Sequence, residues 1–240
     1  MPAGTGLPPL GELGRVLCQV RQRTDKIVVM VSGGKESLAT LDACVRAFEA
    51  KNVVGVLMEL VKGLECEWAP IRLAERRHGV KVIGVPHFDL SRLLRNSILR
   101  PYAPGSEKIR LLKQLDVENY IRRITGFEWI AWGMRAADST FRNAYLKKCH
   151  GVDVKKRRCY PVWTFRRNDV IGYLNAKRIP IPVGIAGKKD RGGISLTPEC
   201  LAWMRKLHPA DYQKVLQQFP LAGGQLYRLD HFGKKDPSPQ

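Results

Sequence analysis

The feature that most constrains this chain is the stretch "KIVVMVSGGKESLATLDACV", residues 26–45. A short apolar run rich in β-branched residues ends abruptly at two glycines, and apolar side chains then recur at helical spacing. A short apolar run bounded by glycine is typical of a buried strand, and the spacing that follows is typical of an amphipathic helix. The stretch therefore predicts a strand, a tight loop and a helix in direct succession.

The same alternation continues along the chain. Strand-like runs at "NVVGVLMEL", "VKVIGVPH" and "EWIAWGM" alternate with helical patterns. We predict helices over residues 10–23, 35–51, 64–79, 90–99, 108–124, 135–148 and 168–177, and a helical pair over 198–207 and 209–219. Strands that alternate with helices indicate a parallel sheet covered on both faces. The predicted fold class is α/β, a doubly wound, Rossmann-like three-layer sheet with a small C-terminal helical extension.

Length and composition agree with a folded protein outside the membrane. The chain has 240 residues, of which 44% are hydrophobic. It has no apolar run of the roughly 18 residues that cross a bilayer, and its start lacks the pattern of a signal peptide. We predict no membrane partner and a cytoplasmic location. The expected division is a lead-in over 1–25, a main domain over 26–195, a helical extension over 196–230 and a disordered tail over 231–240.

The charge of the chain indicates a polyanionic partner. The formal net charge is +19, and residues 142–191 hold 14 Lys and Arg against three Asp, a net of +11. A basic segment of this density attracts nucleic acid, polyphosphate nucleotides or acidic proteins. We predict an adenine nucleotide as ligand on the grounds given below, and tRNA or DNA as a candidate partner of segment 142–191.

The loop "SGGKES" has the chemistry of a phosphate site. In a parallel sheet, ligands lie beyond the carboxyl ends of the strands, where loops lead into helices. Gly33 and Gly34 allow close backbone approach, and the following helix presents N–H groups and a partial positive charge. Ser32 and Ser37 add hydroxyls, and Lys35 adds a charge. A glycine turn without a ligand is the alternative interpretation.

Three motifs in order give the chain a resemblance to a known family. "VMVSGGKESL" resembles the PP-loop of the adenine nucleotide α-hydrolase superfamily, whose pattern is S-G-G-x-D-S. "WIAWGMRAADSTFR" (129–142) and "PVWTFRRNDVIGYLNAKRIPIP" (161–182) resemble the second and third motifs of phosphoadenosine-phosphosulfate (PAPS) reductases and their relatives. The resemblance covers about residues 25–200. It implies a PP-loop nucleotide-binding domain over 26–195.

The resemblance also implies a set of site residues. The nucleotide-binding residues would be Ser32, Gly33, Gly34, Lys35, Glu36, Ser37, Gly133, Arg135 and Arg142, and the catalytic ones Lys35, Ser37 and Arg135. Glu36 stands where the family has aspartate, and that carboxylate would orient the loop or ligate Mg²⁺. The implied cofactors are ATP or PAPS with Mg²⁺.

The cysteines differ from the family pattern. Reductases of this family carry a nucleophilic cysteine in an E-C-G-x-H-like segment near the C-terminus, and the last 17 residues here, "GQLYRLDHFGKKDPSPQ", contain none. Cys200 follows Glu199 but lacks the glycine and histidine, and its spacing with apolar residues suits a buried thiol. The paired cysteines of related iron–sulfur enzymes are absent, so we expect no iron–sulfur cluster.

These observations leave three functions open. The first is a PP-loop enzyme that acts at the α-phosphate of ATP or a related nucleotide by adenylyl transfer with pyrophosphate release, in sulfur metabolism or nucleic-acid modification. The second is sulfonucleotide reduction by an atypical cysteine, Cys200, with thioredoxin as electron donor. The third is a non-catalytic module that binds nucleotide or nucleic acid.

Overall fold

The computed structural model describes residues 10–181 and 193–232. The first part of the predicted lead-in, the last part of basic segment 142–191 and almost all of the predicted disordered tail lie outside the described residues. Within the described ranges no helix is long and apolar enough to cross a membrane.

A six-stranded sheet forms the centre of the molecule, in the order β3-β2-β1-β4-β6-β5. The strands are β1 (Ile27–Met30), β2 (Val53–Glu59), β3 (Lys81–Pro86), β4 (Trp129–Ala131), β5 (Val152–Asp153) and β6 (Arg158–Cys159). Every neighbouring pair is parallel except β5 and β6. The predicted parallel α/β sheet is therefore confirmed, and two short strands that the sequence pattern did not predict extend it at one edge.

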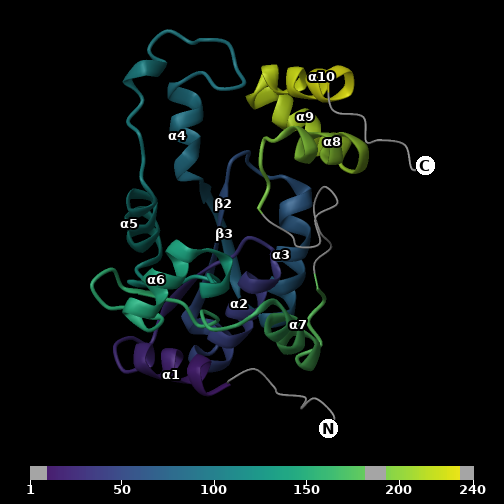
Figure 1. The fold of residues 1–240 in the computed structure, drawn as a ribbon. Helices are drawn as coiled ribbons and strands as arrows, with labels where there is room; N and C mark the ends of the chain where they lie inside the picture. The colour runs from purple at the N-terminus through teal and green to yellow at the C-terminus, as the bar shows by residue number, and fades with distance from the viewer. Residues whose placement is uncertain (1–9, 182–192, 233–240) are drawn as a thin grey trace, which may run out of the picture.

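Helices surround the sheet, as Figure 1 shows. They are α1 (Leu10–Arg21), α2 (Lys35–Phe48), α3 (Glu65–His78), α4 (Phe88–Arg95), α5 (Gln114–Thr125), α6 (Thr140–Cys149), α7 (Arg167–Ala176), α8 (Pro198–Leu207), α9 (Pro209–Gln218) and α10 (Gly223–Phe232). Two predicted starts were wrong. Helix α5 begins at 114 rather than 108, because the Asp116 carboxylate accepts the N–H of Lys113 at 2.8 Å and so caps the helix there. Helix α6 begins at 140, where the Ser139 hydroxyl accepts the N–H of Arg142 at 3.2 Å.

Alternate residues of the central strand face two separate apolar clusters. Ile27 and Val29 of β1 pack in one cluster with residues of α1, α2, α3 and α7, whereas Val28 and Met30 pack in another with residues of α5. The period-2 alternation of a strand sends successive side chains to opposite faces. The sheet is thus buried on both faces, which gives the three-layer arrangement.

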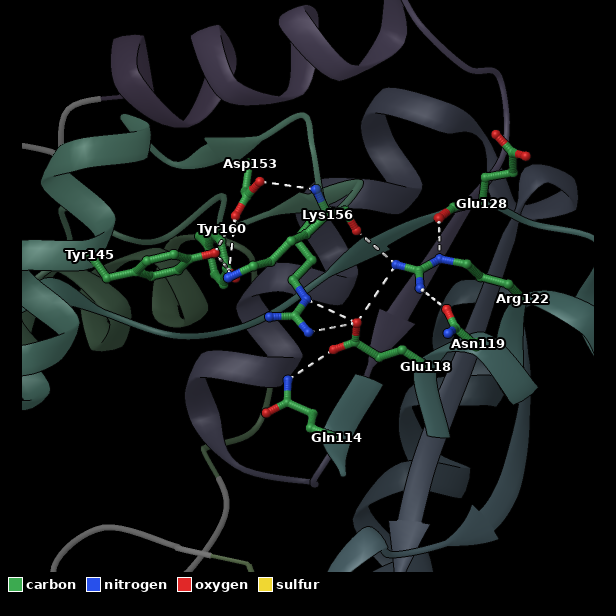
Figure 2. A network of polar contacts seen from close by, with 10 residues as sticks. Gln114, Glu118, Asn119, Arg122, Glu128, Tyr145, Asp153, Lys156 and Tyr160 are labelled. Carbon is green, nitrogen blue, oxygen red and sulfur yellow. Dashed lines mark hydrogen bonds and ion pairs between the residues drawn. The ribbon is translucent and has the colours of Figure 1, made fainter. Parts of the chain in front are cut away.

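A buried ion pair fixes α5 to the edge of the sheet (Figure 2). Glu118 of α5 is fully buried, and its Oε2 lies 2.9 Å from Arg158 Nε and 2.8 Å from Arg158 Nη2. Gln114 donates to the other carboxylate oxygen at 2.8 Å, and Arg122 Nη2 lies 3.6 Å from Oε2. A buried carboxylate needs such partners because it has lost its hydration.

The C-terminal helices form a cluster of their own. Helices α8, α9 and α10 gather beside α4 at one end of the molecule (Figure 1) and enclose an apolar core with residues that follow β2. Asp211 of α9 joins this cluster to the main domain, because its carboxylate accepts the N–H groups of Glu65 and Cys66 at 2.9 and 2.7 Å. These N–H groups open α3 and have no partner inside that helix.

Candidate functional site

The sheet has a topological switch point between β1 and β4. From β1 the chain places β2 and β3 on one side, and it returns to place β4 on the other side. Loops that leave two such strands diverge, and the crevice between them is where ligands bind in open α/β sheets. The glycine-rich loop follows β1 and the segment 132–135 follows β4, so the first two sequence motifs meet at this crevice.

A cavity of about 720 Å³ lies at this edge of the sheet. Its volume falls within the range of small-molecule and cofactor sites. The lining residues come mainly from the ends of β1, β2 and β4 and from the segments that follow them, with His87 after β3, Glu67 of α3, Gln114 of α5 and residues 193–194 in addition. Among them are Met30, Ser32, Lys35, Glu36, Ser37, Met58, Leu60, Trp132, Gly133, Arg135, Asp138 and Arg142. Seven of the nine predicted nucleotide-binding residues therefore line one cavity.

The glycine-rich loop is held by its own serines. Gly33 has φ +68°, the left-handed region that side chains other than glycine rarely adopt, and Gly34 caps α2. The Ser37 hydroxyl donates to the Gly34 carbonyl at 2.8 Å and accepts the N–H of Ser32 at 3.2 Å. Ser37 thus closes the loop, and the N-terminus of α2 faces the cavity.

Gly133 allows the loop after β4 to touch the start of α2. A Cβ atom on Gly133 would lie 2.9 Å from the backbone of Glu36 and Ser37. No real Cβ atom approaches backbone so closely, so a side chain here would force the two loops apart. The sequence resemblance marked Gly133 as nucleotide-binding; its position gives it a packing role between the two motifs.

Charged side chains from both loops form one network. Glu36 Oε1 lies 2.9 Å from Lys35 Nζ and 3.1 Å from Arg135 Nη2, and all three side chains are largely buried. Arg135 Nη2 also lies 2.7 Å from Asp138 Oδ1, and Asp138 Oδ2 lies 3.2 Å from Arg142 Nη1. The site therefore holds three cations that are bridged by two carboxylates.

Two buried donors of this cavity lack a protein partner. Arg135 is 8% exposed, and its Nε has no hydrogen-bond partner. The indole Nε1 of Trp132 is also buried without one. Buried donors in proteins are almost always satisfied by protein, water or a ligand. Both residues line the cavity, so an acceptor-rich ligand would supply what these donors lack.

The cavity lining also includes apolar side chains and one histidine. Met30, Met58, Leu60 and Trp132 supply apolar surface. His87 caps α4, because its Nδ1 accepts the N–H of Asp89 at 3.1 Å. Burial lowers the pKa of His87 below its ordinary value, with Asp89 opposing the shift. The neutral ring therefore carries its proton on Nε2, which makes His87 a hydrogen-bond donor there.

Three of these lining residues, His87, Asp138 and Trp132, were not among the site residues predicted from the sequence. His87 is the last residue of the predicted strand "VKVIGVPH", a position that points to the same edge of the sheet. Asp138 lies inside the second motif, "WIAWGMRAADSTFR", but was not among the residues that the resemblance implies for the site. Trp132 gave no signal, because an aromatic residue at a strand end is ordinary core material.

Cys200 lies apart from this chemistry. It is 3% exposed within the apolar cluster of the C-terminal helices and does not line the cavity. Glu36 remains a predicted Mg²⁺ ligand, although its carboxylate contacts two cations here. Among residues 10–181 and 193–232, no group of three or more His, Cys, Asp or Glu side chains is placed to hold a metal ion.

Comparisons with known proteins add little. No family model matches the chain, and neither does any curated protein. One similar solved structure is the U34-tRNA thiolase NcsA from Methanococcus maripaludis with its 4Fe-4S cluster. It is 16% identical, has a TM-score of 0.48, and the match covers 92% of this chain and 79% of that chain. A likeness of this extent is no basis for an activity.

This comparison corrects one expectation. We expected no iron–sulfur cluster because paired cysteines are absent from the sequence, and that expectation is contradicted by a similar structure that carries one. Cysteine spacing along a chain does not determine which thiols meet in space or across subunits, so the exclusion is withdrawn. The fold and the cavity define a mostly parallel, three-layer α/β protein with a charged and apolar cleft at the carboxyl edge of its sheet.

Proposed function

We propose that this protein is a PP-loop enzyme that binds ATP or a related adenine nucleotide and acts at its α-phosphate. The observation that carries the proposal is the buried Arg135, whose Nε lacks a partner, beside Lys35 at the glycine-rich N-terminus of α2. A planar guanidinium and a helix N-terminus are both suited to phosphate oxygens.

The mixed lining of the cavity suits a nucleotide, which has an apolar base and charged phosphates. The apolar surface of Met58 and Leu60 suits a base, and the cations Lys35, Arg135 and Arg142 suit phosphates. His87 adds a single donor to the lining. A volume of about 720 Å³ is sufficient for such a ligand.

In the proposed reaction an acceptor nucleophile attacks the α-phosphorus. The bond from that phosphorus to the bridging oxygen of the β-phosphate breaks, and pyrophosphate leaves with the electron pair. Lys35 and Arg135 stabilise the negative charge that develops on the leaving oxygens. Ser37 keeps the loop closed through its bonds to Gly34 and Ser32, which is a positioning role.

The test is nucleotide binding by calorimetry, followed by pyrophosphate release with a panel of acceptors. Loss of one charge-assisted contact costs about 1.5–3 kcal/mol, so Lys35→Ala should weaken ATP binding by roughly 10- to 150-fold. Arg142→Gln, at a half-exposed position, tests a second cation of the cavity lining without disturbing the core. Lys51→Ala is the matched control, since Lys51 is 77% exposed and does not line the cavity.

Unchanged ATP affinity in both site variants would overturn the proposal. Binding without pyrophosphate release across all acceptors would leave a nucleotide-binding module. Release of sulfite from PAPS with reduced thioredoxin, lost in Cys200→Ala, would replace adenylyl transfer with sulfonucleotide reduction.

A further inference from the structure

Helix α6 carries an exposed aromatic ring next in sequence to a residue that lines the cavity. Phe141, in its first turn, is 83% exposed, more than any other large hydrophobic residue of the described ranges. Its sequence neighbour Arg142 lines the cavity, whereas Phe141 itself does not. Single exposed apolar residues are common on protein surfaces. Whether the exposed Phe141 ring indicates a binding surface depends on the residues around it.

Those surroundings are positively charged. Helix α6 has the sequence "TFRNAYLKKC", with three cations and no acidic residue. Lys147 and Lys148 are exposed, and Phe141, Ala144 and Lys148 share one face by their i, i+3, i+7 spacing. Seven residues of helix span roughly 10 Å. We call Phe141, Arg142, Lys147 and Lys148 the α6 surface.

The turn between β5 and β6 extends this positive surface. Lys156 Nζ lies 4.9 Å from the centroid of the Tyr145 ring, which places the turn against α6. Lys155 in the same turn is exposed. Asp153, the acid closest in sequence to this turn, accepts a hydrogen bond from Tyr145 and is paired with Lys156. Asp138, which pairs with Arg142, is a second acid at this surface. The three cations of α6 together with Lys155 and Lys156 therefore outnumber these two acids.

We propose that the α6 surface binds a single-stranded nucleic acid, with one base stacked on Phe141 and the phosphates along the cations. A cationic track with an exposed aromatic ring is how proteins hold single strands, because every base has a face that stacks and every nucleotide has a phosphate. In a duplex the base faces are stacked on one another, so a duplex could contact the cations but not stack a base on Phe141. If the bound strand is the acceptor that attacks the nucleotide in the cavity, that role rests on the proposed function. Binding of the strand to the α6 surface does not require nucleotide.

The experiment measures fluorescence anisotropy of a labelled 12-nucleotide single strand, as RNA and as DNA, over a series of salt concentrations. Phe141→Ala should weaken binding by roughly 5- to 150-fold, the effect of one lost stacked base, and leave the salt slope unchanged. Phe141→Trp should restore affinity. The double variant Lys147→Ala, Lys148→Ala should lower the slope of log K against log salt by about 1.4, because each phosphate contact on a single strand contributes about 0.7.

Two controls distinguish binding at the α6 surface from nonspecific binding. Tyr227→Ala removes another exposed aromatic ring, on α10, and should not change the affinity. Heparin, a polyanion without bases, should bind Phe141→Ala and the unchanged protein equally. Equal affinities of Phe141→Ala and the unchanged protein for the single strand would overturn the proposal, and so would a preference for duplex of the same length.

Failure of this inference and failure of the proposed function have different signatures. Phe141→Ala should bind ATP with unchanged affinity, since the ring does not line the cavity. If ATP binding is absent while the strand binds through Phe141, the proposed function fails and the surface stands. If ATP binds and the strand does not depend on Phe141, the surface fails and the nucleotide site stands.

Discussion

Replacing Glu36 with glutamine removes one negative charge from between two largely buried cations and leaves the shape of the side chain nearly unchanged. The carboxylate contacts Lys35 Nζ at 2.9 Å and Arg135 Nη2 at 3.1 Å. It therefore occupies a place between two cations where a phosphate oxygen of the proposed ligand would also be stabilised. Glu36 should compete with the ligand in the empty protein.

The size of the effect follows from the two contacts. Charge-assisted hydrogen bonds contribute about 1.5–3 kcal/mol and neutral ones about 0.5–1.5 kcal/mol, so each contact loses about 1 kcal/mol in Glu36→Gln. The free energy of unfolding without ligand should fall by about 2 kcal/mol, or roughly 4–8 °C in Tm for a chain of this length. Ligand binding no longer displaces a carboxylate, so ATP affinity should rise by up to about 30-fold.

The assay is a pair of measurements on the same variant. Differential scanning calorimetry without ligand gives the loss of stability, and titration calorimetry with ATP gives the affinity. Glu36→Asp is the second variant, because it keeps the charge and shortens the reach to Arg135. It should show intermediate stability and an affinity closer to that of the unchanged protein.

A fall in both stability and ATP affinity in Glu36→Gln would refute this reasoning. Such a result means that the carboxylate supports the ligand, as expected of a residue that binds Mg²⁺ together with the nucleotide. A titration with and without Mg²⁺ then separates the two cases, since only a metal ligand makes the loss of affinity depend on the ion.

Three further outcomes follow from the packing and from burial. In chemical denaturation, Gly133→Ala should lower the free energy of unfolding by about 1–3 kcal/mol, because its Cβ would lie 2.9 Å from backbone, and it should also weaken ATP binding. The control Gly172→Ala should be neutral or stabilising in the same assay, because a Cβ there would have nothing within 4 Å. Glu118→Ala should cost about 3–5 kcal/mol by leaving a mostly buried arginine without its carboxylate, and a loss below 1 kcal/mol would contradict the structural role of this pair. Burial lowers the pKa of His78 below its ordinary 6.5, and the nearby Asp42 opposes this shift. As pH falls, His78 therefore becomes protonated in the unfolded state at a higher pH than in the folded state. The free energy of unfolding should therefore decrease below about pH 6.5, and His78→Gln should reduce that slope in thermal scans between pH 7 and 5.

The first half of the fold was predictable because local pattern and tertiary role coincide there. Residues 27–30 form a fully buried strand, and such a strand has an uninterrupted apolar sequence. The strands β5 and β6 have two residues each, too short for any periodicity to show. The predicted start of α5 was wrong because the Asp116 carboxylate accepts the N–H of Lys113 and so begins the helix there. The apolar spacing of residues 109–112 continues the helical pattern, but those residues are not helical.

Which residues share the cavity was partly predictable, but their contacts were not. The motif positions predicted one nucleotide site for Lys35, Glu36 and Arg135, and all three line one cavity. Nothing in the sequence pairs the glutamate with that arginine. Pairing depends on which strands are neighbours, and it is the β1–β4 contact that brings the two loops together. Phe141 gave no signal, because a sequence does not show whether a ring in the first turn of a helix packs or is exposed.

The positions of both Gly133 and Arg135 depend on the register of β4 in the sheet. Strand β4 has three residues and is followed at once by the loop that carries both. Two backbone bonds hold that loop beyond the strand: Trp132 N–H donates to the Cys159 carbonyl at 2.9 Å, and Ala136 N–H donates to the Trp163 carbonyl at 2.8 Å. Shifting β4 by one residue would exchange its two faces and turn Arg135 away from Glu36. The third sequence motif, which contains Trp163, therefore contacts the second motif at Ala136, the residue after Arg135.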